Sequence, residues 1–323
     1  MPLAQPRTPD GLIQTSATRP LASTFLRGES TAMNKVPRYP WQIALVHEDD
    51  DLVVVVKPAG LPTANAPRGR PSLYQILSDR WGPSGFVGIV SRLDAPVSGL
   101  VVVAKTPVAA ARLSEQFRER TIGKHYVAVV AGRFPAPLEQ WAEWTDHMLR
   151  AVGNRNSTIE RSADATHLRA KIEGPPRAGQ GSRVKLDVEG PQLGHRPQDA
   201  GNPRQDQPSV QAAHTRARVL RRAGEVSLVE LEPLTGRRHQ LRVQLGSRGC
   251  PIVGDRQYGS RLPYPEPGGI ALHACELELE HPTNSRRLRL TASLPAAWRS
   301  RFGQLFPGRP PESPPTGSTL EAL

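Results

Sequence analysis

Three short runs of apolar residues constrain what this chain can fold into. They occupy residues 52–56, 99–104 and 126–130, and valine is the commonest residue in each. Runs of this length between turn-forming segments are typical of buried strands. They are far shorter than the ~18 residues of a membrane-spanning helix. The sequence therefore predicts a core built on a β-sheet and no transmembrane segment.

Further elements complete the pattern of an α+β protein. Residues 72–81 and 235–247 predict helices, and a third helix is expected after Thr106, which suits an N-cap and is followed by proline. The remaining strands, of which the first two form a hairpin, are expected at residues 215–220, 225–231, 272–280 and 287–291. Strands outnumber helices, so we predict an α+β fold with a mixed or antiparallel sheet flanked by helices.

Segments rich in proline and polar residues flank and interrupt this pattern. The chain holds 33 prolines in 323 residues. Residues 1–40 predict a disordered basic segment, with a targeting peptide or a later start at Met33 as alternatives. Residues 153–210 predict a polar, mostly irregular insertion in the folded domain of residues 41–300, and residues 301–323 predict a proline-rich disordered tail.

The charge of the chain favours a polyanionic partner. Lysine and arginine number 42 against 30 for aspartate and glutamate, which gives a formal net charge of +12. Nucleic acid is the simplest such partner, and a surface charged only for solubility is the alternative. The two cysteines, Cys250 and Cys275, are too few for a disulfide framework or a four-cysteine zinc site, and they fit a reducing cytoplasm.

The first candidate site lies directly after the strand expected at residues 52–56. Pro58 fixes a backbone dihedral angle and Gly60 allows a tight turn, so Lys57 is presented at the end of the strand. Lys57 is then either available to an anion or an ordinary solvated lysine at a strand-to-turn junction.

The second candidate site, residues 91–100, holds Arg92 and Asp94 between two apolar stretches. In an extended segment both side chains point to one face. A carboxylate surrounded by so much buried sequence must be paired, hydrogen-bonded or protonated. Asp94 is therefore either a functional carboxylate or the cap of a structural turn.

The third candidate site, residues 235–245, concentrates positive charge. Arg237, Arg238, His239 and Arg242 lie within six residues, a composition that suits contacts with phosphate. A solvated basic face of the expected helix is the alternative interpretation.

Taken in order, these sites and their neighbours resemble the motifs of the RluA-type RNA pseudouridine synthases. The resemblance covers residues 45–295, and the matching stretches are residues 57–60, 92–100, 124–128, 235–242 and 249–255. Each motif alone is unspecific, whereas five in the right order are specific. Ser91 stands where the family usually has histidine, and Val56 stands where it often has asparagine.

The resemblance implies an isomerase whose catalytic domain spans residues 41–300 and which needs neither cofactor nor metal. Such an enzyme breaks the bond between C1′ and N1 of a uridine in RNA and joins C1′ to C5 of the same uracil. Asp94 would act at C1′ as a nucleophile or as a stabilising charge. Arg242 would pair with Asp94, and Tyr126 would line the pocket against the uracil.

The resemblance also implies how RNA is bound. The uridine must be flipped out of its stack, and Arg92 would fill the vacated position. The substrate would further be held by Lys57, Arg237, Arg238 and His239. Whether the RNA is ribosomal or transfer RNA stays open.

An RNA-binding protein that keeps the fold without catalysis is the alternative function. No helix-turn-helix or zinc-finger pattern supports a DNA-binding protein. We expect a monomeric, cytoplasmic protein whose partner is RNA and not a membrane.

Overall fold

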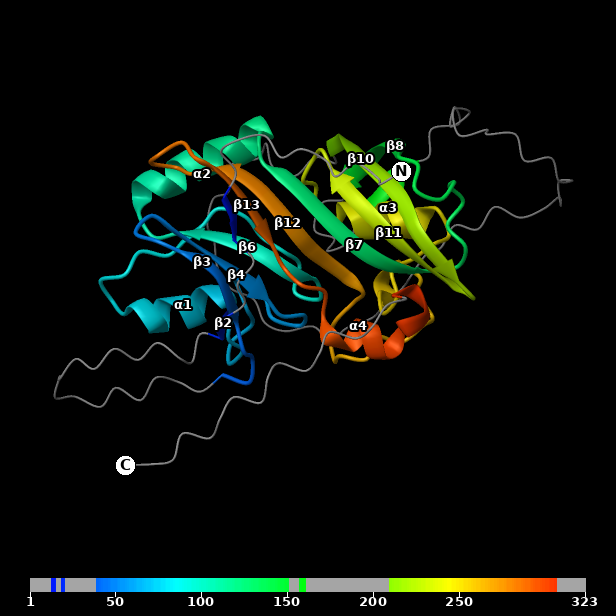
Figure 1. Cartoon of the computed structure of the whole chain (residues 1–323), viewed down its shortest axis with the longest axis horizontal. Coiled ribbons are helices and arrows are strands. Elements are labelled where there is room, and N and C mark those ends of the chain that lie inside the picture. Colours follow the sequence, from blue (N-terminus) through cyan, green and yellow to red (C-terminus); the bar gives the residue numbers. More distant parts are fainter. Residues whose placement is uncertain (1–12, 16–18, 21–38, 151–156, 161–208, 307–323) are drawn as a thin grey trace, which may run out of the picture.

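The fold is organised around one large mixed β-sheet (Figure 1). The computed structural model describes residues 13–15, 19–20, 39–150, 157–160 and 209–306. The strands in these ranges are β1 (Ile13–Thr15), β2 (Arg19–Pro20), β3 (Ala44–Glu48), β4 (Leu52–Lys57), β5 (Gly88–Ile89), β6 (Ser98–Ala104), β7 (Gly123–Ala131), β8 (Ala142–Arg150), β9 (Ser157–Glu160), β10 (Ser209–Ala223), β11 (Val226–Pro233), β12 (Leu272–Glu280) and β13 (Arg287–Thr291). The helices are α1 (Leu73–Trp81), α2 (Pro107–Glu119), α3 (Gln240–Ser247) and α4 (Ala296–Arg301), with short 3-10 helices η4 (Arg256–Tyr258) and η5 (Gly303–Leu305).

The strand order makes β12 the central strand of the sheet. The main order is β2-β3-β4-β6-β12-β7-β11-β10-β8-β9, while β13 pairs with β12, β1 with β13 and β5 with β6. β12 runs parallel to β6 and antiparallel to β7. The expected α+β fold with a mixed sheet is thus confirmed. None of the helices in the described ranges is long and apolar enough to cross a membrane.

Except for Lys57 at the end of β4 and Ser98 at the start of β6, strands β4 and β6 are apolar because a helix packs on each of their faces. Val53 and Val55 of β4 lie in one buried cluster with residues of α1. The alternating Leu52 and Val54 lie in another cluster, with residues of α2. Figure 1 shows these two helices on opposite sides of the strands. Burial on both faces explains why neither strand alternates between apolar and polar residues.

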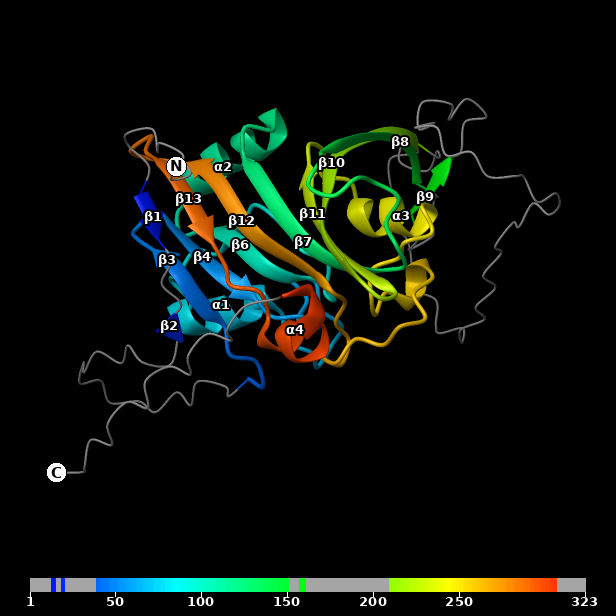
Figure 2. The same ribbon diagram turned by 45° about the vertical axis from the view of Figure 1, so that its right-hand side comes forward.

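The other half of the sheet curves around α3 (Figure 2). Leu241 and Leu245 of α3 belong to the largest buried cluster, together with residues of β7, β10 and β11. The last described residues belong to the same cluster. Trp298, Phe302 and Leu305 pack in it and are at most 4% exposed.

Local signals set where the first two helices begin. Ser72 Oγ accepts the backbone N–H of Gln75 at the start of α1. Thr106 Oγ1 accepts that of Ala109 at the start of α2, where Pro107 occupies the first turn. Both helices begin as the sequence predicts, and the hairpin of β10 and β11 and the strands β12 and β13 are likewise confirmed.

Helix α3 begins later than the sequence predicts. Residues 235–239 form a turn against β10, in which Thr235 Oγ1 accepts the N–H of His214 at 2.9 Å. Gln240 Nε2 donates to the carbonyl of His214 at 3.0 Å. The turn leaves His239 with φ 56°, outside the right-handed helical region, so the helix starts at Gln240.

The three segments predicted to be irregular contain ordered portions. Within residues 1–40, β1 pairs with β13 and β2 pairs with β3. Within residues 153–210, β9 pairs with β8, and β10 begins at Ser209. The tail predicted from residue 301 is wrong for residues 301–306, because their apolar side chains pack into the core. Residues 39 and 40 are also described, and the other residues of these segments lie outside the described structure.

Candidate active site

The loop before β6 carries Asp94, and hydrogen bonds fix its backbone. Thr63 Oγ1 accepts the N–H of Leu93 at 3.1 Å and donates to the Leu93 carbonyl at 2.8 Å. The carbonyl of Asp94 accepts the N–H of Val97 at 3.0 Å, which closes a turn. The side chain of Asp94 thus projects from a backbone that is held both within the loop and from outside it.

Lys57 stabilises the same loop. Its side chain is fully buried, and its ammonium group donates to the carbonyls of Pro58, Leu61 and Ala95 at 2.9, 2.7 and 3.2 Å. Burial lowers the pKa of Lys57 to about 7, while the charge of Asp94 opposes this shift. The expected contact between Lys57 and a substrate phosphate is incompatible with this position, because the ammonium group does not reach solvent.

Arg242 of α3 joins Asp94 to a second carboxylate. Its Nε and Nη2 donate to Asp255 Oδ2 and Oδ1 at 2.7 and 2.9 Å, a bidentate geometry. Its Nη1 donates to Asp94 Oδ2 at 3.2 Å, and Nη2 also reaches Gln257 Oε1 at 2.9 Å. Burial acts to lower the pKa of Arg242, but Asp255 and Asp94 outweigh it and raise that pKa. The structure thus contains the expected ion pair between Arg242 and Asp94.

His239 also lies against Asp94. Its Nε2 is 3.6 Å from Asp94 Oδ2, and its Nδ1 is 2.7 Å from the phenol oxygen of Tyr258. The Tyr258 ring in turn lies 4.9 Å from the guanidinium carbon of Arg242. Burial lowers the pKa of His239, against the opposing charge of Asp94. The structure places His239, expected among the substrate-binding residues, beside the carboxylate.

Tyr126 lies on β7, where pairing with both neighbouring strands fixes it. Its partners across the sheet are Leu231 of β11 and Ala274 of β12. Burial and the nearby charge of Asp94 raise the pKa of Tyr126, so its phenol is protonated at neutral pH. Asp94 and Arg242 are thus in contact from separate parts of the chain, and Tyr126 lies near enough for the charge of Asp94 to act on its phenol.

The remaining predicted arginines differ in how accessible they are. Arg92 and Arg238 are exposed. Arg238 acts electrostatically on His239, and Arg92 lies two residues before Asp94. Arg237 is half-buried, and its Nε donates to the carbonyl of Ala212 at 3.2 Å, so it is the least free of the three.

Three residues of the site had no predicted role. Asp255, Gln257 and Tyr258 all contact Arg242 from η4 and its N-terminal flank. Asp255 lies in the last of the matching motifs and follows an apolar stretch that ends at Val253. A carboxylate next to buried sequence needs a partner, so this signal could have marked Asp255 as a paired carboxylate, although it does not name Arg242 as the partner.

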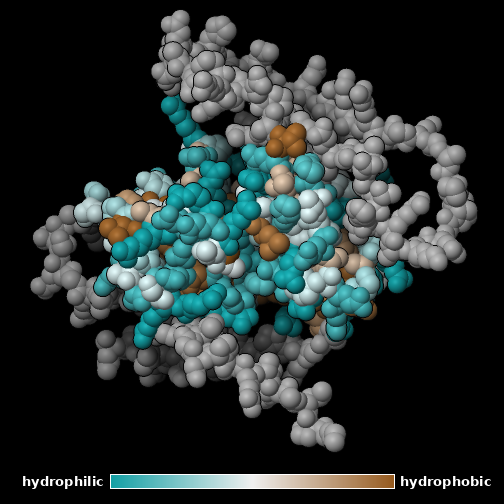
Figure 3. All heavy atoms as spheres, turned by 90° about the horizontal axis from the view of Figure 1, so that it is seen from above, coloured by the Kyte–Doolittle hydropathy of each residue, from teal (hydrophilic) through white to brown (hydrophobic). Residues whose placement is uncertain are grey.

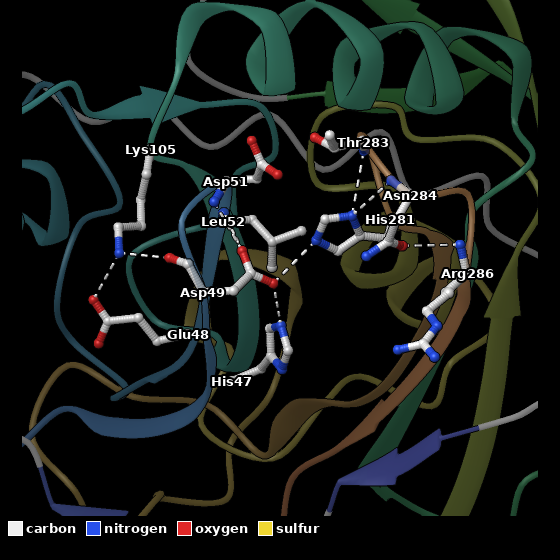
Figure 4. A network of polar contacts seen from close by, with 10 residues as sticks. All are labelled: His47, Glu48, Asp49, Asp51, Leu52, Lys105, His281, Thr283, Asn284 and Arg286. Carbon is white, nitrogen blue, oxygen red and sulfur yellow. Dashed lines mark hydrogen bonds and ion pairs between the residues drawn. The ribbon is translucent and has the colours of Figure 1, made fainter.

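A separate polar network ties one end of the sheet together (Figure 4). Asp49 Oδ1 accepts the N–H groups of Asp51 and Leu52, both at 2.9 Å. Asp49 Oδ2 lies 2.6 Å from His47 Nε2 and 3.0 Å from His281 Nε2. Partial burial acts to raise the pKa of Asp49, but these hydrogen bonds lower it to about 2.

The same network has the composition of a metal site but not its chemistry. Ligand atoms of Asp49, Asp51 and His281 come within 4.8 Å of one another. However, His281 Nδ1 accepts the N–H groups of Thr283 and Asn284 at 3.2 and 3.3 Å, so the Nε2 facing Asp49 carries the proton. An imidazole engaged at both nitrogens is not a free ligand, and the hydrogen bonds account for the cluster.

The face of the molecule seen from above is mostly hydrophilic (Figure 3). Its apolar residues form small, separate patches among polar ones. A charged partner can therefore approach this face without covering a continuous apolar surface.

Comparison with known proteins identifies relatives of one kind. Residues 51–247 match the family described as RNA pseudouridylate synthase. A protein of Vibrio cholerae named ribosomal large subunit pseudouridine synthase C is 27% identical over 272 residues, which cover 83% of this chain and 70% of the relative. A protein of the same name from Rickettsia conorii is 29% identical over 259 residues, covering 80% and 70%.

Two solved human structures share the fold. The structure named human RNA pseudouridylate synthase domain containing 4 matches with a TM-score of 0.56 and 24% identity, covering 81% of this chain and 92% of the other. Human RNA pseudouridylate synthase domain containing 1 matches with a TM-score of 0.52 and 23% identity, covering 78% and 83%.

Proposed function

Because the chain belongs to the RNA pseudouridylate synthase family and so isomerises uridine to pseudouridine in RNA, we propose that Asp94 carries the reaction and that the substrate is ribosomal RNA. The relatives named above support ribosomal RNA, since their names refer to the large ribosomal subunit. Transfer RNA is the alternative substrate.

The reaction needs a group that stabilises a sugar deprived of its base. The bond between C1′ and N1 breaks, the uracil turns, and C1′ joins C5. C5 loses its proton and N1 gains one, so atoms and charge balance without a redox partner. A carboxylate next to C1′ supplies a nucleophile or a counter-charge at this stage. Asp94 has the position for this role because its side chain is 28% exposed, next to groups that are almost wholly buried.

The contact between Arg242 and Asp94 carries the proposal. A carboxylate withdrawn from water needs a partner to offset its desolvation. Arg242 provides that partner, and its bidentate contact with Asp255 sets the direction in which Nη1 points. Asp94 thus keeps a single direct contact with Arg242 while remaining open to substrate.

Tyr126 and the arginines complete the proposed machinery. In this proposal the protonated phenol of Tyr126 packs against the uracil and donates a hydrogen bond during the rearrangement. In this proposal Arg92, which is exposed, occupies the space that the flipped uridine leaves in the RNA. Arg238 and, to a smaller extent, Arg237 contribute phosphate contacts, which the formal charge of +12 supports.

The test is Asp94→Asn, which keeps the shape of the side chain and removes its charge. Tritium release from 5-tritiated uridine in transcripts of large-subunit ribosomal RNA and of transfer RNA reports the breaking of the C5–H bond. The variant should release none while binding RNA as the wild type does. Asp50→Asn, a change at an exposed residue, is the control and should be fully active. Turnover by Asp94→Asn at more than a few per cent of the wild-type rate would show that Asp94 is not the reacting group.

We also propose that the protein acts as a monomer in the cytoplasm. Its two cysteines are free, with Cys250 buried, which suits a reducing compartment. Sedimentation of the full chain at micromolar concentration should give a mass near 35.2 kDa. A mass of twice this value would overturn the monomer.

A further inference from the structure

The contact between His239 and Tyr258 has no part in the chemistry proposed above. His239 has φ 56°, a left-handed conformation that is costly for residues with a Cβ. Residues held in such conformations persist where the surrounding structure fixes them, and they cluster at functional sites. Its two ring nitrogens face Tyr258 on one side and Asp94 on the other.

The charge of Asp94 determines which nitrogen of His239 carries the proton. An unprotonated Nε2 would direct its lone pair at the negative Asp94 oxygen and be repelled by it. Nε2 therefore bears the hydrogen. Nδ1 is then an acceptor, and its partner at 2.7 Å is the hydroxyl of Tyr258, which must donate. The Tyr258 hydroxyl therefore selects the tautomer of His239 that presents an N–H group to Asp94.

Tyr258 supports both groups that contact Asp94. Its hydroxyl engages His239, and its ring lies 4.9 Å from the guanidinium carbon of Arg242. His239 Nε2 and Arg242 Nη1 both face Asp94 Oδ2, at 3.6 and 3.2 Å. Both residues thus approach the same carboxylate oxygen, Oδ2.

We propose that His239 and Tyr258 are positioning residues for Asp94, in which the Tyr258 hydroxyl holds His239 as the Nε2–H tautomer and this N–H restrains Asp94 Oδ2 when RNA occupies the site. The inference rests on the proposed catalytic role of Asp94. The present 3.6 Å is longer than a hydrogen bond, and such contacts in free enzymes often tighten only in the complex with substrate.

The neutral state of His239 follows from all the groups that face it. They are the negative Asp94 and Asp255, the positive Arg238 and Arg242, and the phenol of Tyr258. Two negative and two positive groups thus face the ring, and burial, which is the largest effect on its pKa, favours the neutral form. Loss of the Tyr258 hydroxyl removes a donor to the neutral ring and should make His239 easier to protonate.

Amide side chains separate the roles of the two nitrogens. The glutamine amide nitrogen reaches the place of Nε2, whereas the asparagine amide reaches only that of Nδ1. His239→Gln should keep kcat within about threefold of wild type, and His239→Asn should lower it about tenfold or more, which is ~1.4 kcal/mol of transition-state stabilisation. The KM for RNA should change less than kcat. The assay is tritium release from 5-tritiated ribosomal and transfer RNA transcripts.

Tyr258→Phe tests the hydroxyl separately, because phenylalanine keeps a ring against Arg242. It should lower kcat at neutral pH, where the neutral ring can then take either tautomer, and the loss should shrink at low pH, where the protonated ring carries hydrogen on both nitrogens. Matched controls are His147→Asn and His147→Gln on β8 and Tyr74→Phe on α1, all at exposed positions. These variants should leave kcat and the pH profile unchanged. Retained RNA binding shows that a variant is folded.

Equal kcat values for the asparagine and glutamine variants of His239 would overturn the inference. A loss of kcat in Tyr258→Phe that is the same at every pH would overturn it as well, because a purely structural hydroxyl has no effect that depends on the protonation of His239. Failure of the wild-type protein to release tritium from either RNA would instead overturn the proposed function, so the two failures are distinguishable.

Discussion

At the scale of single residues, one guanidinium serves two carboxylates of unequal exposure. The side chain of Asp255 is 1% exposed and takes the bidentate contact with Arg242. The side chain of Asp94 is 28% exposed and takes a single contact. The buried carboxylate therefore aims the arginine, and the exposed one keeps the freedom that a reacting group requires.

Removal of the buried carboxylate should destabilise the fold as well as the site. Asp255→Ala strands the Arg242 charge in the interior, and breaking one partner of a buried pair typically costs ~3–5 kcal/mol. Urea unfolding of wild type and variant measures this loss. Glu115→Ala, which removes an exposed partner of Arg118 on α2, is the control and should cost about 1 kcal/mol or less. Equal losses in the two variants would contradict the assignment of Asp255 as the anchor of Arg242.

A buried histidine should make stability depend on pH. His273 of β12 is 1% exposed, and its Nδ1 lies 2.9 Å from Ser98 Oγ of β6. Burial lowers its pKa from 6.5 to about 4, although backbone hydrogen bonds oppose the shift. Between these values the unfolded chain binds more protons than the folded one, so stability falls as pH drops from about 6.5 to about 4.

The comparison with His273→Gln isolates this effect, because the variant cannot titrate there. The difference in unfolding free energy between the two proteins should change by up to ~1.4 kcal/mol per pH unit inside that window and stay constant above it. Urea unfolding at pH 7.5, 6.0 and 5.0 provides the measurement. Parallel curves for the two proteins would show that His273 is not buried in its neutral form.

At the scale of elements, the close approach of β6 and β12 depends on a glycine. Gly99 has φ 121°, and a Cβ placed there would lie 2.3 Å from the carbonyl oxygen of Ala274. Gly99→Ala should therefore cost about 2–5 kcal/mol, from backbone strain and from overpacking against a neighbouring backbone. Thermal unfolding measures the loss. Gly69 also has a positive φ, 79°, but a Cβ added there would have no atom within 4 Å. Gly69→Ala is the control and should retain most of the stability. Equal melting temperatures for both variants would rule out the close contact as the cause.

Elements with a local cause could be predicted from the sequence, and those set by distant contacts could not. The strands β4 and β6 and the starts of α1 and α2 follow from residues next to one another. The start of α3 does not, because His214, 21 positions before Thr235, holds the turn. The buried location of Lys57 was missed for the same reason, since one of its acceptors, Ala95, lies 38 positions away.

The candidate site shows the same division. The resemblance of the motifs to those of a known family brought out Asp94, Tyr126 and Arg242, whereas the residues alone left other interpretations open. Two contacts depend instead on the packing of α3 against η4, which no local sequence pattern predicts. They are the anchoring of Arg242 by Asp255 and the contact of His239 with Tyr258.

At the scale of the whole molecule, the last described residues belong to the core. Trp298, Phe302 and Leu305 are buried against β7, β10 and β11, and Trp298 Nε1 donates to Tyr264 at 2.8 Å. Removing residues 296–323 should abolish the cooperative thermal transition, since each lost aromatic side chain alone costs ~3–5 kcal/mol. The chain that ends at residue 306 is the matched control. Cooperative melting of the shorter chain at the same temperature would contradict this role.

The central position of β12 has a consequence for synthesis on the ribosome. β6 and β7 emerge early, yet the strand that pairs with both is made only at residues 272–280. At 5–20 residues per second, roughly 7–28 s pass between completion of β7 and the start of β12. During this interval the nascent chain exposes two unpaired strand edges, which invite association with other chains. Chaperone occupancy on the translating chain should accordingly rise once β7 has left the exit tunnel and fall when β12 does.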